Sequence, residues 1–445
     1  MIAVATSTML LDAVPASPSS SAHAPRGTTR VRIACPDARP PAYQAAIACA
    51  RAGVLDALIT SYYYRGGPPR WLARVAPTSF ARLDGFLKRR QGPGIPRDKV
   101  QSCWSFDLAL AVERRLGASR AGTRHALARW RTRHFDRQLA RDLARQGPDA
   151  ALIFSDVGSE YALPTCRDHG VATVLSMVHG DVREERLVLE REAESAPDFF
   201  PIYLGDGPID RHELDWLHER RLLDIAAADR ILVPSEHIAG ELERHGTPRD
   251  RIAVIPYAAD VRCFRPDAAK GHGDACTFLF AGGITQRKGI KYVLESWRRI
   301  RRPGWRLQLL GSLPADPGPL RPYLDEVELL GRVPHDQVPA RMAAADVFVF
   351  PSLFEGSAVV TYEALACGLP SIVTAEAGSV VRDGREGFVV PARDIESLAA
   401  AMERLGRDPA LREHLAKAAR ARAEDFDWPR YHAAVLAAIE TAVCP

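Results

Sequence analysis

The sequence predicts an α/β protein built from two Rossmann-like, doubly wound domains that face a central cleft. Short apolar runs typical of buried parallel strands recur along the chain, with helix-length spacers between them. The chain has 445 residues, more than one hydrophobic core usually holds. A polar stretch without periodicity, FRPDAAKGHGDAC at residues 264–276, separates two series of runs and suits a linker between domains.

The strand-like runs indicate where each domain lies. Those of the first series begin near Val31, Ala150, Ala172, Arg230 and Ile252, and those of the second near Thr277, Trp305, Val327, Asp346, Pro370 and Gly387. We expect a disordered tail over residues 1–28, an N-terminal domain over 29–265 and a C-terminal domain over 270–426. Ligands of such sheets bind beyond the carboxyl ends of the strands, here after His179, Gly282, Gly311, Val333 and Phe354.

Composition excludes several classes of protein. The chain is 47% hydrophobic and 26% charged, and its apolar runs fall short of the ~20 residues that span a membrane. Its eight cysteines form no C-x-x-C pair, so we expect buried, reduced thiols of a cytoplasmic protein and neither a disulfide nor a zinc framework. The Ala/Ser/Pro/Thr-rich start lacks the features of a secretory signal.

Charge is unevenly distributed although the net charge is only +4. Arginine and lysine greatly outnumber acids between Arg65 and Arg145. A basic helix of this kind could contact an anionic surface, such as the inner face of the cell membrane. A solvated helix face explains the same pattern equally well. We expect no nucleic-acid partner.

Two carboxylates frame a small-residue turn in LFEGSAVVTYEALACGLP, residues 353–370. The preceding ADVFVFPS is typical of a buried strand, and Gly368 and Pro370 are helix-stop signals. Glu355 is therefore predicted in a loop and Glu363 on a helix. A helix start presents unsatisfied N–H groups that favour phosphate. Carboxylates that bind vicinal hydroxyls on either side of a phosphate suggest a sugar nucleotide.

A second candidate site follows the strand in FLFAGGITQRKGIKYVLESW. Gly282 and Gly283 would let the backbone approach a phosphate. Arg287 and Lys288 could neutralise the charge that grows on a leaving diphosphate. By itself the pattern is weak, because glycine pairs after strands and basic helix starts are common without function.

Together these stretches and DRILVPSEH, residues 229–237, resemble the retaining glycosyltransferases of family four, which have the GT-B fold. The family's two glutamates with seven residues between them match Glu355 and Glu363. Its lysine–glycine pair matches Lys288 and Gly289, and its proline–serine strand end matches residues 234–235. The resemblance is strong over residues 230–428 and loose in the N-terminal third.

The resemblance implies a role for each matched residue. Glu355 would contact hydroxyls of the transferred sugar, and Glu363 the ribose. The amides of Gly356, Ser357 and Ala358 would bind the diphosphate together with Lys288. The family commonly has a histidine where His179 ends a strand, beside donor sugar and acceptor. The backbone at Val333 would hold the base.

Three departures from the family pattern affect these roles. Gly283 stands where the family often has an arginine, so either Arg287 takes over that charge or the site is weaker. CPDARPPAYQAA from Cys35 replaces a glycine-rich loop after the first strand, which leaves the acceptor side open. YAAD at residues 257–260 replaces the usual asparagine–glycine turn of the hinge.

The resemblance implies a retaining transfer from a nucleotide-diphosphate-sugar to a hydroxyl of a glycan, lipid-linked or small-molecule acceptor, as in polysaccharide biosynthesis. No metal or other cofactor is expected, because Lys288 and a helix terminus can replace a cation. Residues 427–445 look like the family's closing helix, which returns to the first domain. A sugar-nucleotide epimerase of the same fold and a catalytically silent binding module remain the alternatives.

Overall fold

The computed structural model describes residues 29–444 apart from 38–39, 65–89, 91, 93, 117–120, 146, 206–208 and 268–272. The predicted tail at 1–28 lies outside the described residues. So do much of the arginine-rich stretch before residue 90 and the middle of the predicted linker. Among the described residues, no helix is long and apolar enough to cross a membrane.

The first sheet has seven parallel strands in the order β3-β2-β1-β4-β5-β6-β7. These strands span Val31–Ala34 (β1), Leu55–Thr60 (β2), Val100–Ser102 (β3), Ala150–Phe154 (β4), Ala172–Ser176 (β5), Arg230–Val233 (β6) and Ile252–Val254 (β7). Strands β2 and β3 coincide with no predicted run. Asp56 interrupts the apolar run of β2, and β3 is too short to show a pattern.

The second sheet has six parallel strands in the order β10-β9-β8-β11-β12-β13. They span Cys276–Ala281 (β8), Trp305–Leu310 (β9), Glu328–Gly331 (β10), Val347–Phe350 (β11), Ser371–Val373 (β12) and Gly387–Val389 (β13). Two doubly wound parallel sheets confirm the predicted fold class. All six strands of this sheet coincide with predicted runs.

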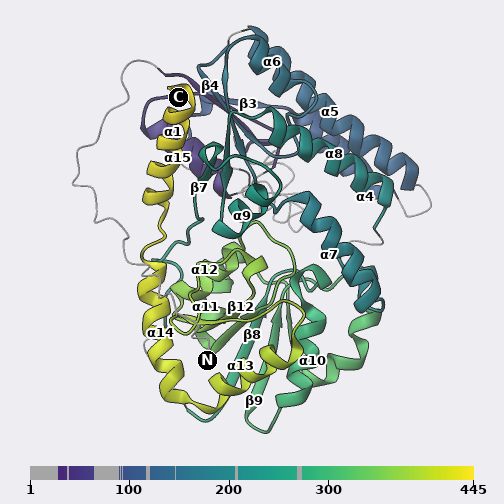
Figure 1. Cartoon of the computed structure of the whole chain (residues 1–445), viewed down its shortest axis with the longest axis vertical. Helices are drawn as coiled ribbons and strands as arrows, with labels where there is room; N and C mark the ends of the chain where they lie inside the picture. Colours follow the sequence, from purple (N-terminus) through teal and green to yellow (C-terminus); the bar gives the residue numbers. More distant parts are fainter. Residues whose placement is uncertain are drawn as a thin grey trace, which may run out of the picture.

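Helices connect the strands and cover the sheets (Figure 1). Those of the N-terminal half are α1 (Pro40–Arg51), α4 (Trp104–Arg115), α5 (Ala121–Arg145), α6 (Ala162–Asp168), α7 (Val182–Ser195), α8 (Arg211–Ala227) and α9 (Glu236–Arg244). Those of the C-terminal half are α10 (Ile290–Ile300), α11 (Val338–Ala344), α12 (Val359–Ala366), α13 (Ile395–Arg407), α14 (Pro409–Ala423) and α15 (Trp428–Val443).

Alternating residues of β4 show why the strands are almost wholly apolar. Ala151 and Ile153 enter the core that α5 and α6 cover, whereas Leu152 and Phe154 enter the core beneath α1 and α15. Because a strand's side chains alternate between faces, a sheet buried on both sides needs apolar residues at consecutive positions.

The final helix, α15, lies against the first sheet although it follows the second in sequence (Figure 1). Tyr431 donates from its hydroxyl to the Pro41 carbonyl at 3.2 Å, and His432 is hydrogen-bonded to Gln44 at 2.7 Å. These bonds attach α15 to α1, so the chain crosses between the two sheets a second time.

Helix α7 also joins the two sheets (Figure 1). Its residue Glu192 is fully buried and accepts hydrogen bonds from Tyr292 at 3.0 Å and Arg393 at 2.8 Å, both in the C-terminal half. The Gln286 amide also donates to Glu192. A buried carboxylate with three donors is well satisfied, so the end of α7 is fixed to the second sheet.

The arginines of α5 that could have faced a membrane have partners within the chain. Arg129 pairs with Glu213 at 2.9 Å, and Arg133 pairs with Glu160 at 2.9 Å. Arg137 donates to the Tyr161 hydroxyl at 2.7 Å. Membrane contact through these three positions therefore loses support, since their side chains bind α5 to α8 and to the β4–α6 connection.

We expect charge reversal of these arginines to destabilise the fold. In Arg129→Glu/Arg133→Glu, like charges replace both ion pairs, and Tm should fall by about 3 to 6 °C. Arg141→Glu on the exposed side of α5 is the control and should change Tm by about 1 °C or less. Thermal denaturation of the three proteins checks this; equal Tm values would contradict the structural role.

Candidate active site

The loops after β8 and β9 bring two glycines into backbone contact. Gly282 follows β8 with φ of +139°, a value that L-residues rarely adopt. A Cβ at Gly311 would lie 1.7 Å from the Gly282 carbonyl oxygen, so both positions require glycine. The chain then forms a short 3-10 turn, Gln286–Lys288, and Gly289 begins α10 with φ of +76°.

Lys288, Arg287 and Glu355 meet at the carboxyl end of the second sheet. Leu353 N–H donates to the Arg287 carbonyl at 2.8 Å and attaches the acidic loop to the basic turn. The Lys288 ammonium forms an ion pair with Glu355 Oε1, and Arg287 Nη2 lies 3.8 Å from the same oxygen. The Glu355 side chain is only 13% exposed.

Electrostatics keep this cluster ionised. Burial on its own would raise the pKa of Glu355, but Lys288 and Arg287 outweigh it and lower that pKa. Burial lowers the pKa of Lys288, and Glu355 opposes that effect. Two cations beside Glu355, with the Glu185 carboxylate also acting on Arg287, form a charged cluster that can bind an anionic ligand.

The acidic loop packs directly against the N-terminal half. A Cβ at Gly356 would lie 2.5 Å from the Val178 carbonyl oxygen, so only glycine permits this approach. The Ser235 hydroxyl donates to the Gly356 carbonyl at 2.9 Å. The Phe354 ring occupies the space above Gly180, where a Cβ would lie 2.6 Å from it. Glu355 is thereby held opposite the loop that carries His179.

His179 follows β5 and points toward Asp156 at the end of β4. Its Nδ1 is 2.8 Å from the Gly180 carbonyl oxygen, and its Nε2 is 3.6 Å from Asp156 Oδ1. Arg221 from α8 donates to the same Asp156 oxygen at 2.8 Å. Arg221 also pairs with Glu185 at 3.0 Å.

These groups line a cleft of about 360 Å³ between the two sheets. Its lining comprises Pro40, Pro41, Asp156, Val178, His179, Arg221, Tyr257, Arg287, Phe354, Glu355, Gly356 and Val359. Of the predicted site residues, the cleft lining includes His179, Arg287, Glu355 and Gly356, and Lys288 lies behind Glu355.

Sequence reasoning missed Asp156 and Arg221. Asp156 lies two residues beyond the end of β4, so the rule that ligands bind beyond strand ends could have identified it. Arg221 lies mid-helix without a local signal. The prolines that replace the family's glycine-rich loop, Pro40 and Pro41, begin α1 and face the cleft.

The phosphate-binding role assigned to the Ala358 amide needs correction. Ala358 N–H donates to the Ala377 carbonyl at 3.1 Å and is not free for a ligand. Helix α12 begins one residue later, at Val359, which lines the cleft. Its first-turn N–H groups therefore replace the Ala358 amide as the candidate donors.

Comparison with known proteins connects this geometry to one family. The model for Glycosyltransferase Family 4 matches residues 107–262, and the model for Glycosyl transferases group 1 matches residues 275–408. The chain belongs to glycosyltransferase family 4. The predicted family is thereby confirmed, and the match extends toward the N-terminus as far as residue 107.

Relatives within the family match only part of this chain in sequence. D-inositol 3-phosphate glycosyltransferase of Pseudarthrobacter chlorophenolicus is 35% identical over 246 residues. The match covers 51% of this chain and 58% of the relative. The chain thus spans little more than half the length of this relative.

Two solved structures show the same fold. Sucrose-phosphate synthase from Thermosynechococcus elongatus superposes with a TM-score of 0.62 at 21% identity, over 92% of this chain and 97% of that one. Anabaena HepE in complex with UDP-glucose gives 0.60 at 14% identity, over 93% and 99%. The predicted GT-B fold of family 4 is confirmed.

Five residues expected to bind the donor do not line the cleft: Ser357 and Ala358, which follow Gly356, and the more distant Glu363, Gly283 and Val333. Glu363 is half-buried on α12, one turn beyond Val359. Gly283 directly follows Gly282, and Val333 is half-buried beyond β10, at the edge of the second sheet.

The burial of Glu363 shifts its pKa, and this shift has a measurable effect on stability. Burial raises the pKa of Glu363 from 4.5 to about 7. Because this folded-state pKa lies above the unfolded one, the unfolded chain loses the proton first, and stability falls as pH rises from 4.5 through 7.

We therefore expect Glu363→Gln to raise Tm by roughly 2 to 6 °C at pH 8 and to change it little near pH 5. The exposed Glu440→Gln on α15 is the control and should be neutral at both values. If Glu363 binds ribose, the same variant should weaken UDP binding in calorimetry. A Tm gain that is equal at both pH values would contradict the burial argument.

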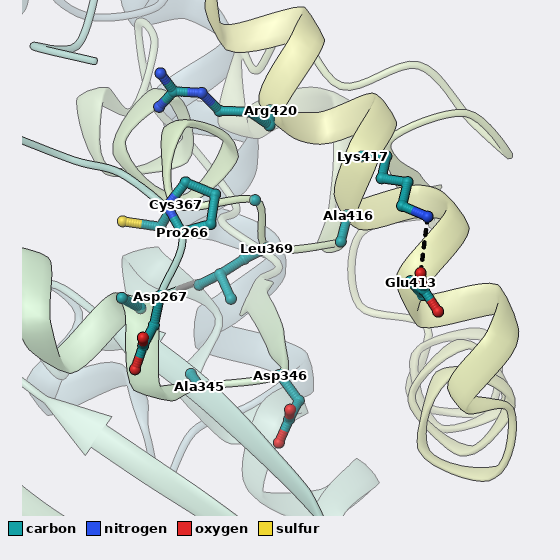
Figure 2. Close-up of a pocket in the computed structure, with 12 residues that line it drawn as sticks. Pro266, Asp267, Ala345, Asp346, Cys367, Leu369, Glu413, Ala416, Lys417 and Arg420 are labelled. Atoms are coloured by element: carbon teal, nitrogen blue, oxygen red, sulfur yellow. Dashed lines mark hydrogen bonds and ion pairs between the residues drawn. The ribbon is translucent and has the colours of Figure 1, made fainter. Parts of the chain in front are cut away.

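A second cavity, of about 580 Å³, lies between the C-terminal end of α12 and helix α14 (Figure 2). Its charged groups serve the fold: Lys417 pairs with Glu413 at 2.7 Å, and Arg420 donates to the carbonyls of Val261, Phe264 and Ala366. A helix C-terminus carries partial negative charge, which disfavours a diphosphate. The site predicted from sequence lies at the opposite end of α12.

Proposed function

We propose that this protein is a retaining glycosyltransferase, which moves a sugar from a nucleotide-diphosphate-sugar to a hydroxyl group. The observation that carries the proposal is the ion cluster of Glu355, Lys288 and Arg287 facing His179 across one cleft. Membership of family 4 supports the reaction type, and the UDP-glucose complex of HepE supports a nucleotide sugar as donor.

The cluster suits a reaction in which negative charge develops on a diphosphate. Lys288, Arg287 and the first turn of α12 would bind the diphosphate, and Glu355 would accept hydrogen bonds from sugar hydroxyls. The acceptor oxygen forms a bond to the anomeric carbon as the bond to the phosphate oxygen breaks. The acceptor proton passes to that departing oxygen, so retention needs no separate protein base.

Because cationic side chains would bind the diphosphate, we expect activity without a metal ion. Lys288 and Arg287 lie beside Glu355 and would neutralise the leaving group themselves. We expect excess EDTA to leave initial rates within about 20% of the untreated enzyme. A loss of activity that magnesium or manganese restores would show that a divalent cation supplies this charge.

Thermal-shift screening with nucleotide diphosphates and their sugars, UDP-glucose first, is the direct test of the donor. A bound donor raises Tm because it binds the folded state alone. Product analysis then separates the reactions. A transferase releases the free nucleotide and glycosylates an acceptor; an epimerase yields an isomeric sugar nucleotide, and a silent module yields no product.

The acceptor is proposed to be a glycan, a lipid-linked sugar or a small polyol. D-inositol 3-phosphate, taken from the name of the relative in Pseudarthrobacter, is a suitable first probe. We place the protein in the cytoplasm, where its six buried and two exposed cysteines, Cys263 and Cys444, would remain reduced.

Peripheral membrane contact is a separate proposal, which lost its original support when the α5 arginines proved to be paired. Sedimentation with anionic vesicles at low and physiological salt tests it. Binding that is restricted to anionic vesicles and weakens with salt would support the contact. No binding at low salt would leave α5 as an internal, ion-paired helix.

A further inference from the structure

Helix α7 connects the loop of His179 with the basic turn Gln286–Lys288 of the C-terminal half (Figure 1). It begins just after His179, and its buried residues are Val182, Glu185, Leu189 and Glu192. Residues spaced three or four positions apart lie on one face of a helix. One face of α7 is therefore buried along the helix, and its last buried residue, Glu192, contacts the turn.

The Gln286 side chain links Glu192 to the start of α10. Gln286 is fully buried. A carboxylate can only accept, so Gln286 Nε2 is the atom that donates to Glu192 Oε2. Gln286 Oε1 then accepts from the Lys291 N–H at 3.2 Å, a first-turn group of α10 that has no acceptor within its own helix. Both ends of the amide are bonded, which fixes the side chain in one orientation.

The basic turn is held by both halves of the chain. The Arg287 N–H donates to the carbonyl of Tyr203, a fully buried residue that follows α7. The Arg287 carbonyl accepts from the Leu353 N–H of the acidic loop at 2.8 Å. Gly205 packs so closely that a Cβ there would lie 2.6 Å from the Thr285 side chain. The end of α7 and the segment after it thus form one wall of the turn.

The two oxygens of Glu192 bind different elements of the C-terminal half. Oε1 accepts from the Tyr292 hydroxyl on α10 at 3.0 Å and from Arg393 Nε, before α13, at 2.8 Å. Oε2 accepts from Gln286 in the turn. The contact with the turn can therefore be removed without removing the other two.

We propose that Glu192 is a positioning residue for the transfer reaction, and that it acts through Gln286 on the turn whose cations bind the diphosphate. The proposal rests on the proposed glycosyltransferase function. It gives part of the donor site to a residue of the N-terminal half that does not line the cleft. Arg287 directly follows Gln286, so a shift of the turn moves Arg287 and Lys288 together. A displacement of about 1 Å can cost about 100-fold in rate.

Glu192→Gln separates the two oxygens of the carboxylate. Arg393 can only donate, so the oxygen of the new amide stays toward Arg393 and Tyr292. The amide nitrogen then faces Gln286 Nε2, and two opposed donors replace the hydrogen bond to the turn. We expect UDP affinity in calorimetry to fall about 10-fold and kcat/KM about 10- to 100-fold. Another nucleotide diphosphate replaces UDP if the thermal-shift screen selects it.

The exchange Glu192→Gln/Gln286→Glu is the rescue. It again places a donor opposite a carboxylate and keeps the number of charges, and the carboxylate at position 286 can accept from the Lys291 N–H. Affinity and kcat/KM should return to within about threefold of the wild type. If Glu192 served only to neutralise Arg393, the exchange would restore neither value, because it moves the charge away from Arg393. A folded exchange variant without rescue would therefore contradict the inference.

Tyr292→Phe is the matched control for stability. Tyr292 is 4% exposed and donates to the same carboxylate, but to Oε1. Loss of its hydroxyl should lower Tm by about 2 to 6 °C and change UDP affinity and kcat/KM by no more than about twofold. All assays are run at a temperature where circular dichroism shows every variant folded.

Two further results would overturn the inference while the transferase function stands. One is a Glu192→Gln enzyme that equals the wild type in UDP affinity and kcat/KM. The other is a Tyr292→Phe enzyme that loses as much of both as Glu192→Gln does, since the effect would then follow stability and not the turn. A wild-type protein that binds no nucleotide diphosphate and transfers no sugar would instead overturn the proposed function.

Discussion

Glu355→Gln is expected to lower turnover by about 100-fold or more while UDP binding is retained. The side chain is 13% exposed and faces both Lys288 and Arg287, so neutralising it leaves two shielded cations without their counter-charge. A hydrogen bond from glutamine to a sugar hydroxyl is also weaker than one from an ionised carboxylate. An interaction that strengthens in the transition state reduces kcat more than ground-state binding.

Steady-state kinetics with the donor identified by thermal shift, together with calorimetry for UDP, measure the two effects. Glu326→Gln is the matched control, because Glu326 is 17% exposed and forms an arginine pair with Arg298 in the same half of the chain. It should retain wild-type turnover. Wild-type turnover in Glu355→Gln would disprove the assigned role. Equal losses in both variants would indicate a general effect on stability.

Gly289→Ala is expected to abolish folding of the C-terminal half or to lower Tm by more than about 10 °C. Gly289 has φ of +76°, and a Cβ there would lie 2.0 Å from the Pro351 carbonyl oxygen. The clash is with backbone, so no side-chain rotation relieves it. Any shift would also displace Lys288, the neighbouring residue, away from Glu355.

Gly304→Ala separates the two causes of this effect. Gly304 has a similar φ of +86°, but a Cβ there would meet nothing within 4 Å. The Gly304→Ala variant is therefore destabilised only by the left-handed backbone conformation. We expect it to lose roughly 1 kcal/mol of stability, or about 2 to 4 °C in Tm. Thermal denaturation of both variants measures the difference. Equal Tm losses would show that contact with Pro351 is unimportant.

Local patterns were sufficient for every strand except β2 and β3, for the helix after Glu355 and for the family. The run ADVFVFPS became β11, and the segment between Gly356 and Gly368 contains α12, as predicted. Such elements depend on residues within a few positions of one another, where apolar runs and glycine or proline signals act directly. The same local signals failed for β2, where Asp56 breaks the run.

The composition of the cleft depends on contacts that no local pattern encodes. The strand-end rule assigned the loops of Glu355, Lys288 and His179 to one cleft, but only the structure shows the contact of Gly356 with Val178 that holds Glu355 opposite His179. Asp156 had no motif beyond its place after β4, and its left-handed backbone is held by the buried side chains of Asp224 and Arg220 on the distant helix α8.

The pairing of charges was likewise decided by the tertiary structure. From sequence, the arginines of α5 were equally compatible with a membrane-binding face and a solvated one. Folding places Glu213 and Glu160 beside Arg129 and Arg133, which satisfies those charges within the chain. The sequence by itself determined the family, helix α12 and every strand except β2 and β3. Only the packing of distant segments determined which polar groups remain free to bind a substrate, because ion pairs form wherever folding brings opposite charges together.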